Sequence, residues 1–202
     1  MSAQPGSTAA SVLLLDVMGT LVYDPFYVDM PAFFGMSLEQ LLAEKHPTAW
    51  VEFEHGEIDG QAFLDRFFTD GRAYDQAGLL ACMRAAYRWL DGVQELLEAL
   101  HARGTRMVAL SNYSTWYEMI EERLELSRYL SWDLVSCHTG LRKPDPEVYR
   151  HAARAVGTTP ERCLFVDDRE VNCEAARSEG MPAVHFTDAR ALRAELEQRG
   201  WL

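Results

Sequence analysis

Residues 12–21 read VLLLDVMGTL, and this stretch decides the fold. Four apolar residues end abruptly on Asp16, and Gly19 and Thr20 follow. An uninterrupted apolar run of this length is typical of a strand that is buried on both faces of a sheet. Ligands of open α/β sheets bind at the carboxyl ends of the strands, so a carboxylate here is a candidate functional group. On this stretch alone, Asp16 could equally be a turn residue that closes a core strand.

The totals describe an ordinary globular chain with an acidic balance. Its 202 residues are 48% hydrophobic and 25% charged, which is enough for one good core and a modest insertion. The net charge of −12 argues against nucleic acid and anionic membranes as partners. It also means that a phosphorylated substrate would need a local cation. No run approaches the roughly 20 apolar residues of a membrane span. None of these features predicts an oligomeric state.

The cysteines and the N-terminus bear on the compartment. The four cysteines have neither CxxC spacing nor a zinc pattern, so we expect reduced thiols in a cytoplasmic protein. The opening residues lack the basic start and long apolar core of a secretory signal. We expect a mobile tail over residues 1–10.

Residues 23–90 differ in character from the rest of the chain. They are rich in aromatic residues and contain no convincing strand. The spacing of Ser37 and Gln40 is that of a capping box and predicts a helix from residue 38, with further helices over 61–68 and 79–90. We predict that residues 23–90 form a small helical domain, inserted into a core domain made of residues 11–22 and 91–202.

From residue 91 onward, helices and strands alternate. We predict strands over 107–110, 134–137, 163–166 and 183–186, and helices over 93–102, 116–126, 146–156, 172–179 and 189–199. This alternation implies a parallel sheet that is covered on both faces. The predicted fold class is α/β: a Rossmann-like parallel sheet with helices on both faces and an all-helical insertion after the first strand.

Polar groups recur where the predicted strands end. Ser111 and Asn112 follow the second strand, Lys143 lies beyond the third, and the pair 167–168, both aspartate, ends the fourth. In a parallel sheet all of them lie with Asp16 along one edge. Each also has a structural explanation on its own, because the Ser-Asn and Asp-Asp pairs could cap helices and the lysine could lie in a solvated turn.

The charges that would gather at this edge point to a chemistry. Three carboxylates within about 5 Å repel one another by roughly 3 kcal/mol per pair at an effective dielectric near 20. They would take up protons or recruit cations, of which Lys143 supplies one. Oxygen ligands select a hard ion such as Mg²⁺, which leaves room for a phosphate. A carboxylate nucleophile beside Mg²⁺ and a lysine suits phosphoryl transfer through an aspartyl-phosphate.

Four short motifs carry a family resemblance: DVMGTL at 16–21, SN at 111–112, KP at 143–144 and FVDD at 165–168. In this order and spacing they resemble the motifs of the haloacid dehalogenase superfamily of hydrolases. The resemblance implies a Rossmann-like core with the helical insertion as a cap over the active site. It also implies that Asp16 is the nucleophile, that Ser111 and Asn112 hold the transferred group, and that Lys143 neutralises that group.

The same resemblance implies a magnesium site. Asp16 and Asp168 would hold Mg²⁺, with Asp167 supporting or sharing the ion. Two residues after the nucleophile, phosphatases of this superfamily usually carry a second aspartate as general acid/base, and this chain has Met18. In the family this position ligates the metal through its backbone carbonyl, which methionine retains.

The proton donor is what Met18 cannot supply, and such a donor typically contributes roughly 10²–10⁴-fold to the rate. Asp24, His138 or solvent could substitute for it, and the sequence favours none of the three.

A narrower resemblance extends through the helical insertion. The stretches DVMGTLVYDPFY, PAFFGMS, KHP, EFEHG, FFTDGR, SNYSTWY and RKPDPEVY resemble the plant plastid-type FMN hydrolase group, which also has methionine at this position. This implies a small phosphorylated substrate, FMN, cleaved as a riboflavin 5′-phosphate monoester. The aromatic residues of the insertion could stack on a flavin ring. Alternatively, they could form the core of the insertion itself.

Two other functions stay open. In a 2-haloacid dehalogenase, Asp16 would attack carbon and displace halide without a metal, although clustered anions such as Asp167 and Asp168 have no use in metal-free chemistry. In a binding module with a degenerate core, the chain would hold a phosphorylated ligand without turnover, and Met18 is the feature that favours this.

Overall fold

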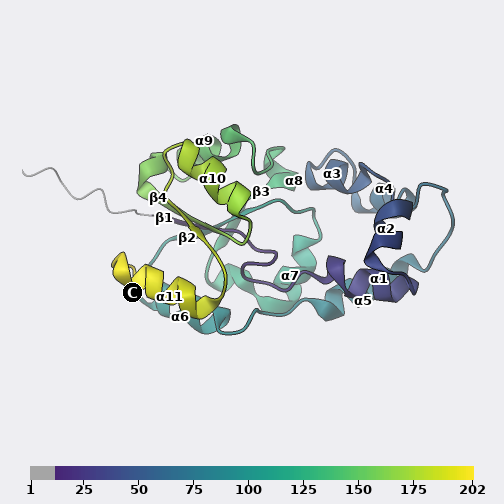
Figure 1. Cartoon of the computed structure of the whole chain (residues 1–202), viewed down its shortest axis with the longest axis horizontal. Helices are drawn as coiled ribbons and strands as arrows, with labels where there is room; N and C mark the ends of the chain where they lie inside the picture. The colour runs from purple at the N-terminus through teal and green to yellow at the C-terminus, as the bar shows by residue number, and fades with distance from the viewer. Residues whose placement is uncertain (1–11) are drawn as a thin grey trace, which may run out of the picture.

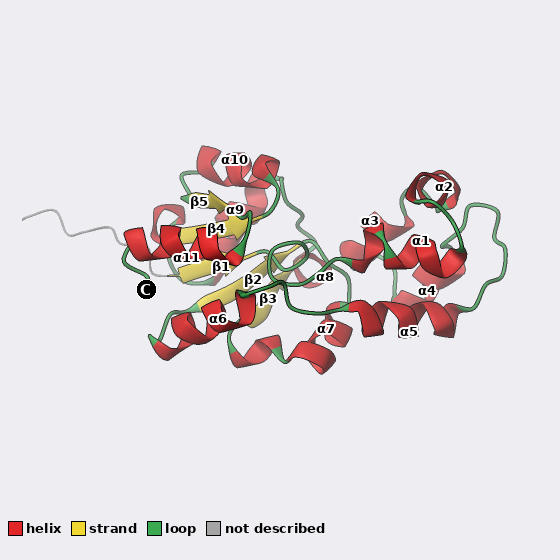
Figure 2. Cartoon of the chain, turned by 60° about the horizontal axis from the view of Figure 1, so that its bottom comes forward, coloured by secondary structure: helices red, strands yellow, loops and turns green. Residues whose placement is uncertain are grey.

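The computed structural model describes residues 12–202, so the tail predicted over residues 1–10 lies outside the described residues. Five parallel strands form one sheet (Figure 1), in the order β3-β2-β1-β4-β5 (Figure 2). The strands are β1 (Val12–Leu15), β2 (Met107–Ser111), β3 (Ser131–Val135), β4 (Cys163–Asp167) and β5 (Ala183–His185). β1 pairs with both β2 and β4, so the stretch that ends on Asp16 lies at the centre of the sheet. The predicted α/β fold class is confirmed.

Helices cover both faces of this sheet. One face is covered by α6 (Val93–Ala102), α7 (Tyr117–Leu124) and α11 (Ala189–Gln198), and the other by α9 (Pro146–Ala155) and α10 (Glu170–Ser178). Leu13 and Leu15 of β1 pack against the first group, and Val12 and Leu14 against the second. All four are at most 2% exposed. This burial on both sides explains why the strand carries no polar residue before Asp16.

The residues between β1 and α6 form a helical segment at one end of the molecule (Figure 2). Its elements are the 3₁₀ helix η1 (Pro25–Tyr27) and the helices α1 (Asp29–Phe34), α2 (Leu38–Glu44), α3 (Ala49–Glu54), α4 (Gly60–Asp65) and α5 (Gln76–Ala86). Both hydrogen bonds of the predicted capping box between Ser37 and Gln40 are present. We call residues 23–90 the helical segment; its boundaries as a domain and its role as a cap stay predictions.

Some element boundaries differ from the predicted ones for identifiable reasons. β3 begins at Ser131, three residues before the predicted strand, because this edge strand starts with partly exposed residues that break the apolar run. Cys137 lies in the short helix α8 (Ser136–Thr139) instead of in the strand. α5 begins early because the Asp75 carboxylate caps it by accepting from the Gly78 backbone N–H. Two further 3₁₀ turns, η2 (Leu126–Arg128) and η3 (Pro160–Arg162), precede β3 and β4.

Most aromatic side chains of the helical segment form its own core. Phe34 contacts the rings of Phe67, Phe68 and Tyr74 at centroid distances of 5.0–5.4 Å. The alternative that the sequence left open therefore holds for these rings, whereas Phe26, Tyr27 and Trp50 also line a pocket.

Two general features complete the fold. All four cysteines are free thiols. Within residues 12–202, no helix combines the length and the apolar character needed to cross a bilayer.

Candidate active site

The carboxyl ends of β1 and β4 bring the predicted acidic residues together. Asp16, Asp167 and Asp168 each place a carboxylate oxygen within 4.8 Å of the others. The Nζ atom of Lys143 lies 2.6 Å from Asp16 Oδ1 and 2.6 Å from Asp167 Oδ2. Lys143 is 3% exposed and Asp16 6% exposed, so these charges are held away from water. Thr20 Oγ1 donates to the other oxygen of Asp16 at 3.2 Å.

Burial shifts the titration of this cluster. It raises the pKa of Asp16 to about 7, against the lowering effect of Lys143, and the negative charges of Asp167 and Asp168 add to the rise. Burial alone would lower the pKa of Lys143, but Asp16 and Asp167 outweigh it and raise that pKa. Burial also raises the pKa of Asp168, and Asp167 adds to this effect. With one ammonium for three carboxylates, the cluster favours the binding of a further cation.

The two adjacent aspartates are placed differently. Asp167 does not line the pocket; its oxygens accept hydrogen bonds from Lys143 Nζ, the Asn172 amide and the Arg169 backbone N–H. Asp167 therefore orients Lys143, and its remaining hydrogen bonds are made with Asn172 and Arg169. Asp168 lines the pocket beside Asp16. The side-chain oxygen Oδ1 of Asn172 is buried without a hydrogen-bond partner among the described residues.

The donor set at the open side of the cluster fits a hard divalent ion. The pocket is lined there by Asp16, Met18, Gly19 and Asp168, which offer carboxylate and backbone carbonyl oxygens. A Cβ at Gly19, whose φ is +81°, would lie 2.6 Å from Asp168 Oδ2. Glycine therefore keeps the space beside this carboxylate free, and the residues fit the predicted Mg²⁺.

Ser111 is the last residue of β2 and Asn112 follows it, but the two side chains differ in their contacts. The Asn112 amide, which lines the pocket, makes two hydrogen bonds to the backbone of Lys143: Nδ2 donates to its carbonyl oxygen and Oδ1 accepts from its N–H, both at 2.8 Å. Asn112 thus holds the loop that carries the lysine. Ser111 does not line the pocket, and its Oγ is buried without a hydrogen-bond partner among the described residues. Their roles toward a transferred group stay predictions.

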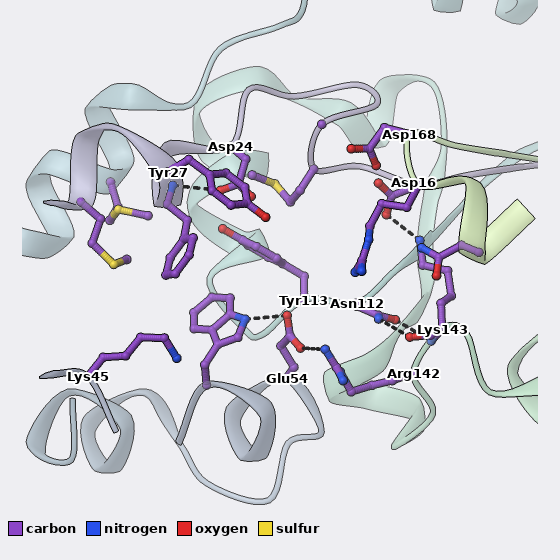
Figure 3. Close-up of a pocket in the computed structure, with 18 residues that line it drawn as sticks. Asp16, Asp24, Tyr27, Lys45, Glu54, Asn112, Tyr113, Arg142, Lys143 and Asp168 are labelled. Carbon is purple, nitrogen blue, oxygen red and sulfur yellow. Dashed lines mark hydrogen bonds and ion pairs between the residues drawn. The ribbon is translucent and has the colours of Figure 1, made fainter. Parts of the chain in front are cut away.

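A pocket of about 470 Å³ lies between this cluster and the helical segment (Figure 3). Its size is in the range of small-molecule sites. The numbers of positively and negatively charged residues that line the pocket are equal, although the whole chain has a net charge of −12. Four are carboxylates and four are cations: Asp16, Asp24, Glu54 and Asp168, and Lys45, Arg142, Lys143 and Arg169.

An ion pair between a buried glutamate and a partly exposed arginine in the pocket wall was not predicted from the sequence. Glu54 Oε2 of α3 lies 2.5 Å from Arg142 Nη2, and Glu54 Oε1 accepts from Trp50 Nε1 at 2.6 Å. Burial raises the pKa of Glu54, and Arg142 opposes that rise. The pair joins the helical segment to the residue before Lys143. The i, i+4 spacing of Trp50 and Glu54 is the only sequence signal for it, and it says nothing of the arginine.

Of the two side chains considered as substitutes for the missing acid, only one reaches the pocket. Asp24 lines it, with Oδ1 accepting from the Phe26 backbone N–H at 2.9 Å, and burial raises the pKa of Asp24. His138 does not line it, and its Nε2 lies 3.1 Å from the hydroxyl of Tyr117.

Comparison with known proteins agrees with this architecture. The family model of haloacid dehalogenase-like hydrolases matches residues 11–180. The chain is 49% identical to flavin mononucleotide hydrolase 1, chloroplastic, of Arabidopsis thaliana over 94% of this chain and 77% of that protein. It is 29% identical to a sesquiterpene phosphatase of Aspergillus oryzae over 81% of this chain and 85% of that protein.

Among solved structures, a haloacid dehalogenase family enzyme of Bacteroides thetaiotaomicron, in complex with magnesium and inorganic phosphate, superposes with a TM-score of 0.69. The match covers 89% of this chain and 95% of that one at 19% identity. At this identity the likeness shows the fold alone.

Proposed function

The chain belongs to the family of haloacid dehalogenase-like hydrolases, and we propose that it hydrolyses a phosphate monoester through Asp16. The observation that carries the proposal is the buried contact between Asp16 Oδ1 and Lys143 Nζ at 2.6 Å, at the inner end of a charge-balanced pocket. A nucleophilic carboxylate needs a group that favours its ionised form and fixes its position; Lys143 fixes Asp16 and favours ionisation against the effect of burial. The two hydrogen bonds between the Asn112 amide and the Lys143 backbone, which we call the Asn112 clamp, fix the position of the lysine in turn.

The proposed reaction has two displacements at phosphorus. An oxygen of Asp16 attacks phosphorus, and the bond to the ester oxygen breaks with its electron pair leaving on that oxygen, which then takes a proton. Water next attacks the phosphorus of the aspartyl-phosphate and loses a proton to the group that gave one up in the first step. The bond to Asp16 breaks with its electron pair returning to the carboxylate, and inorganic phosphate leaves. Lys143, which contacts Asp16 Oδ1, would offset the negative charge of the phosphoryl oxygens that approach Asp16.

Magnesium belongs to the proposal because the residues fit it. Asp16, Asp168 and the backbone carbonyl of Met18 would hold the ion, with Asp167 orienting the lysine beside them. When bound, Mg²⁺ supplies positive charge to the phosphoryl oxygens and relieves the repulsion among the carboxylates.

We assign the proton donor to Asp24. It lies in the pocket on the loop after β1, and burial raises its pKa, which favours the protonated form that a general acid needs. His138 is turned to Tyr117 outside the pocket lining. Asp24 would thus take over the function that an aspartate in place of Met18 would otherwise serve.

We propose FMN as the substrate. The support is the 49% identity to the Arabidopsis enzyme named a flavin mononucleotide hydrolase, together with a pocket that changes from charged at Asp16 to aromatic at Phe26 and Trp50. A cytoplasmic location stays a prediction.

The test is a screen of phosphate monoesters, with FMN among them, against the purified chain with Mg²⁺ and with a chelator, and with a 2-haloacid as control. We expect hydrolysis of FMN with Mg²⁺ only and no release of halide. Halide release that persists in the presence of the chelator would establish the dehalogenase reaction instead. If no ester and no haloacid is turned over, the result would favour a binding module without catalytic activity.

A further inference from the structure

Only two lysines occur in the chain, and both line the same pocket. Lys143 lies at the inner end, buried between Asp16 and Asp167. Lys45 lies on the helical segment at the end of α2, and Figure 3 shows its ammonium end directed into the pocket from the side opposite Lys143. The two ammonium groups thus mark opposite ends of one cavity.

The backbone holds Lys45 in place, while its ammonium is uncommitted. Its N–H donates to the Leu41 carbonyl at 2.9 Å, and the residue forms an antiparallel bridge with Phe68. No ion pair to its Nζ is found among residues 12–202, whereas Lys143 has two. A half-buried ammonium that faces a cavity and has no ion-pair partner among the described residues is suited to bind an acceptor brought in by a ligand.

The surroundings of Lys45 are aromatic and apolar. Phe26, Met30 and Trp50 line the main pocket beside it, and the same three residues with Lys45 also line a smaller hollow that continues toward the core of the helical segment. This end therefore combines mostly apolar walls with the Lys45 ammonium, and His46 also lines the smaller hollow.

Trp50 is fixed before any ligand arrives. Its Nε1 donates to Glu54, and four aromatic rings contact it edge-on at centroid distances of 5.4–6.0 Å. A wall that is already rigid loses little conformational entropy when a flat ring packs against it.

We propose that Lys45 and Trp50 form the subsite for the leaving group, with Lys45 binding the acceptor edge of a planar heteroaromatic ring that packs against Trp50. The ring system of a flavin has such an edge in its pyrimidine carbonyls, whereas a terpenyl group has no acceptor and a small acid such as glycolate has no ring. Lys45 would then determine specificity. This inference rests on the proposed function for its substrate, but the binding of the ring itself requires no turnover.

The experiment compares Lys45→Met with the wild-type full chain in two assays. One is the binding of riboflavin, which has the ring and no phosphate, measured by quenching of flavin fluorescence. The other is steady-state kinetics with Mg²⁺ on FMN and on phosphoglycolate. We expect the Kd for riboflavin and the KM for FMN each to rise about 10–100-fold, which is the range of a charge-assisted hydrogen bond. The kcat for FMN should change little. The KM for phosphoglycolate should change by less than about twofold.

Two variants serve as controls. Lys45→Arg keeps the charge and should restore most of the riboflavin affinity. Arg84→Met removes a charge from an exposed site of the same segment, where Arg84 pairs with Glu122, and should behave as the wild type does.

The outcomes separate this inference from the proposed function. Unchanged riboflavin binding in Lys45→Met, no riboflavin binding by the wild type, or an equal rise of KM for FMN and phosphoglycolate would each overturn the assignment of Lys45. Failure to hydrolyse any ester would overturn the proposed function, while riboflavin binding would still test the subsite.

Discussion

Replacement of Asp16 by asparagine should make the protein more stable while it abolishes turnover. Asparagine has nearly the same shape, and its oxygen can still accept from Lys143, but it carries no negative charge and is no nucleophile. The variant removes one of three carboxylates that share a single ammonium. In a buried cluster with an excess of negative charge, that removal is favourable.

The magnitude follows from the shifted titration of Asp16. Its pKa rises from the ordinary value of 3.8 to about 7, a difference that corresponds to about 4 kcal/mol. Because the native state holds the proton more tightly than the unfolded chain does, the free energy of unfolding of the wild type falls as pH rises from about 4 to about 7. Asparagine does not titrate. We therefore expect the advantage of Asp16→Asn to grow over that pH window and to reach about 2–4 kcal/mol above it.

The assay is urea denaturation of the wild type and Asp16→Asn at several pH values between 4 and 8, with a chelator present throughout. In a parallel series, millimolar Mg²⁺ should stabilise the wild type, by about 2.7 kcal/mol when the Mg²⁺ concentration is 100 times its dissociation constant. Mg²⁺ should stabilise Asp16→Asn less. An Asp16→Asn protein that is less stable than the wild type at pH 8 without metal would refute the reasoning. It would mean that Lys143 alone compensates the buried carboxylate.

Three further predictions concern the proton donor and the lysine loop. Asp24→Asn should lower kcat for alkyl phosphate esters by about 10²-fold or more and spare p-nitrophenyl phosphate, whose leaving group needs no proton; equal losses on both esters would argue against Asp24 as the acid. Met18→Asp should supply a second acid at the pocket wall and raise turnover of alkyl esters, which steady-state assays at pH 7 would show; no gain would indicate that its side chain does not reach the leaving oxygen. Asn112→Ala removes both bonds to the Lys143 backbone, so urea denaturation should show a loss of about 2 kcal/mol or more together with a fall in kcat; wild-type stability would contradict the clamp.

Much of the fold could be predicted because its signals are local. The apolar run before Asp16, the capping box at Ser37 and the alternation of helices and strands after residue 90 each lie within a few residues of one another. From these a parallel sheet follows, and with it the convergence of Asp16, Asp167 and Asp168 at one edge. The edge strand β3 was misplaced because its partly exposed start carries no apolar pattern.

The parts that could not be predicted depend on pairings between distant residues. Glu54 and Arg142 are 88 positions apart, and nothing in either neighbourhood predicts that they meet. The Asn112 clamp likewise depends on how the loop that carries Lys143 returns to β2. The direction in which Lys45 points depends on the packing of the helical segment against the core, which a single sequence does not give.

The most direct test of the central claim is to look for a covalent phosphoryl group on Asp16. The full chain, incubated with FMN and Mg²⁺, is quenched in acid within one turnover and digested, and the peptide that carries residues 12–21 is examined by mass spectrometry. Hydrolysis through Asp16 predicts the added mass of one phosphoryl group on that residue, absent with a chelator and in Asp16→Asn. Turnover of FMN without that mass, or undiminished turnover in Asp16→Asn, would contradict it.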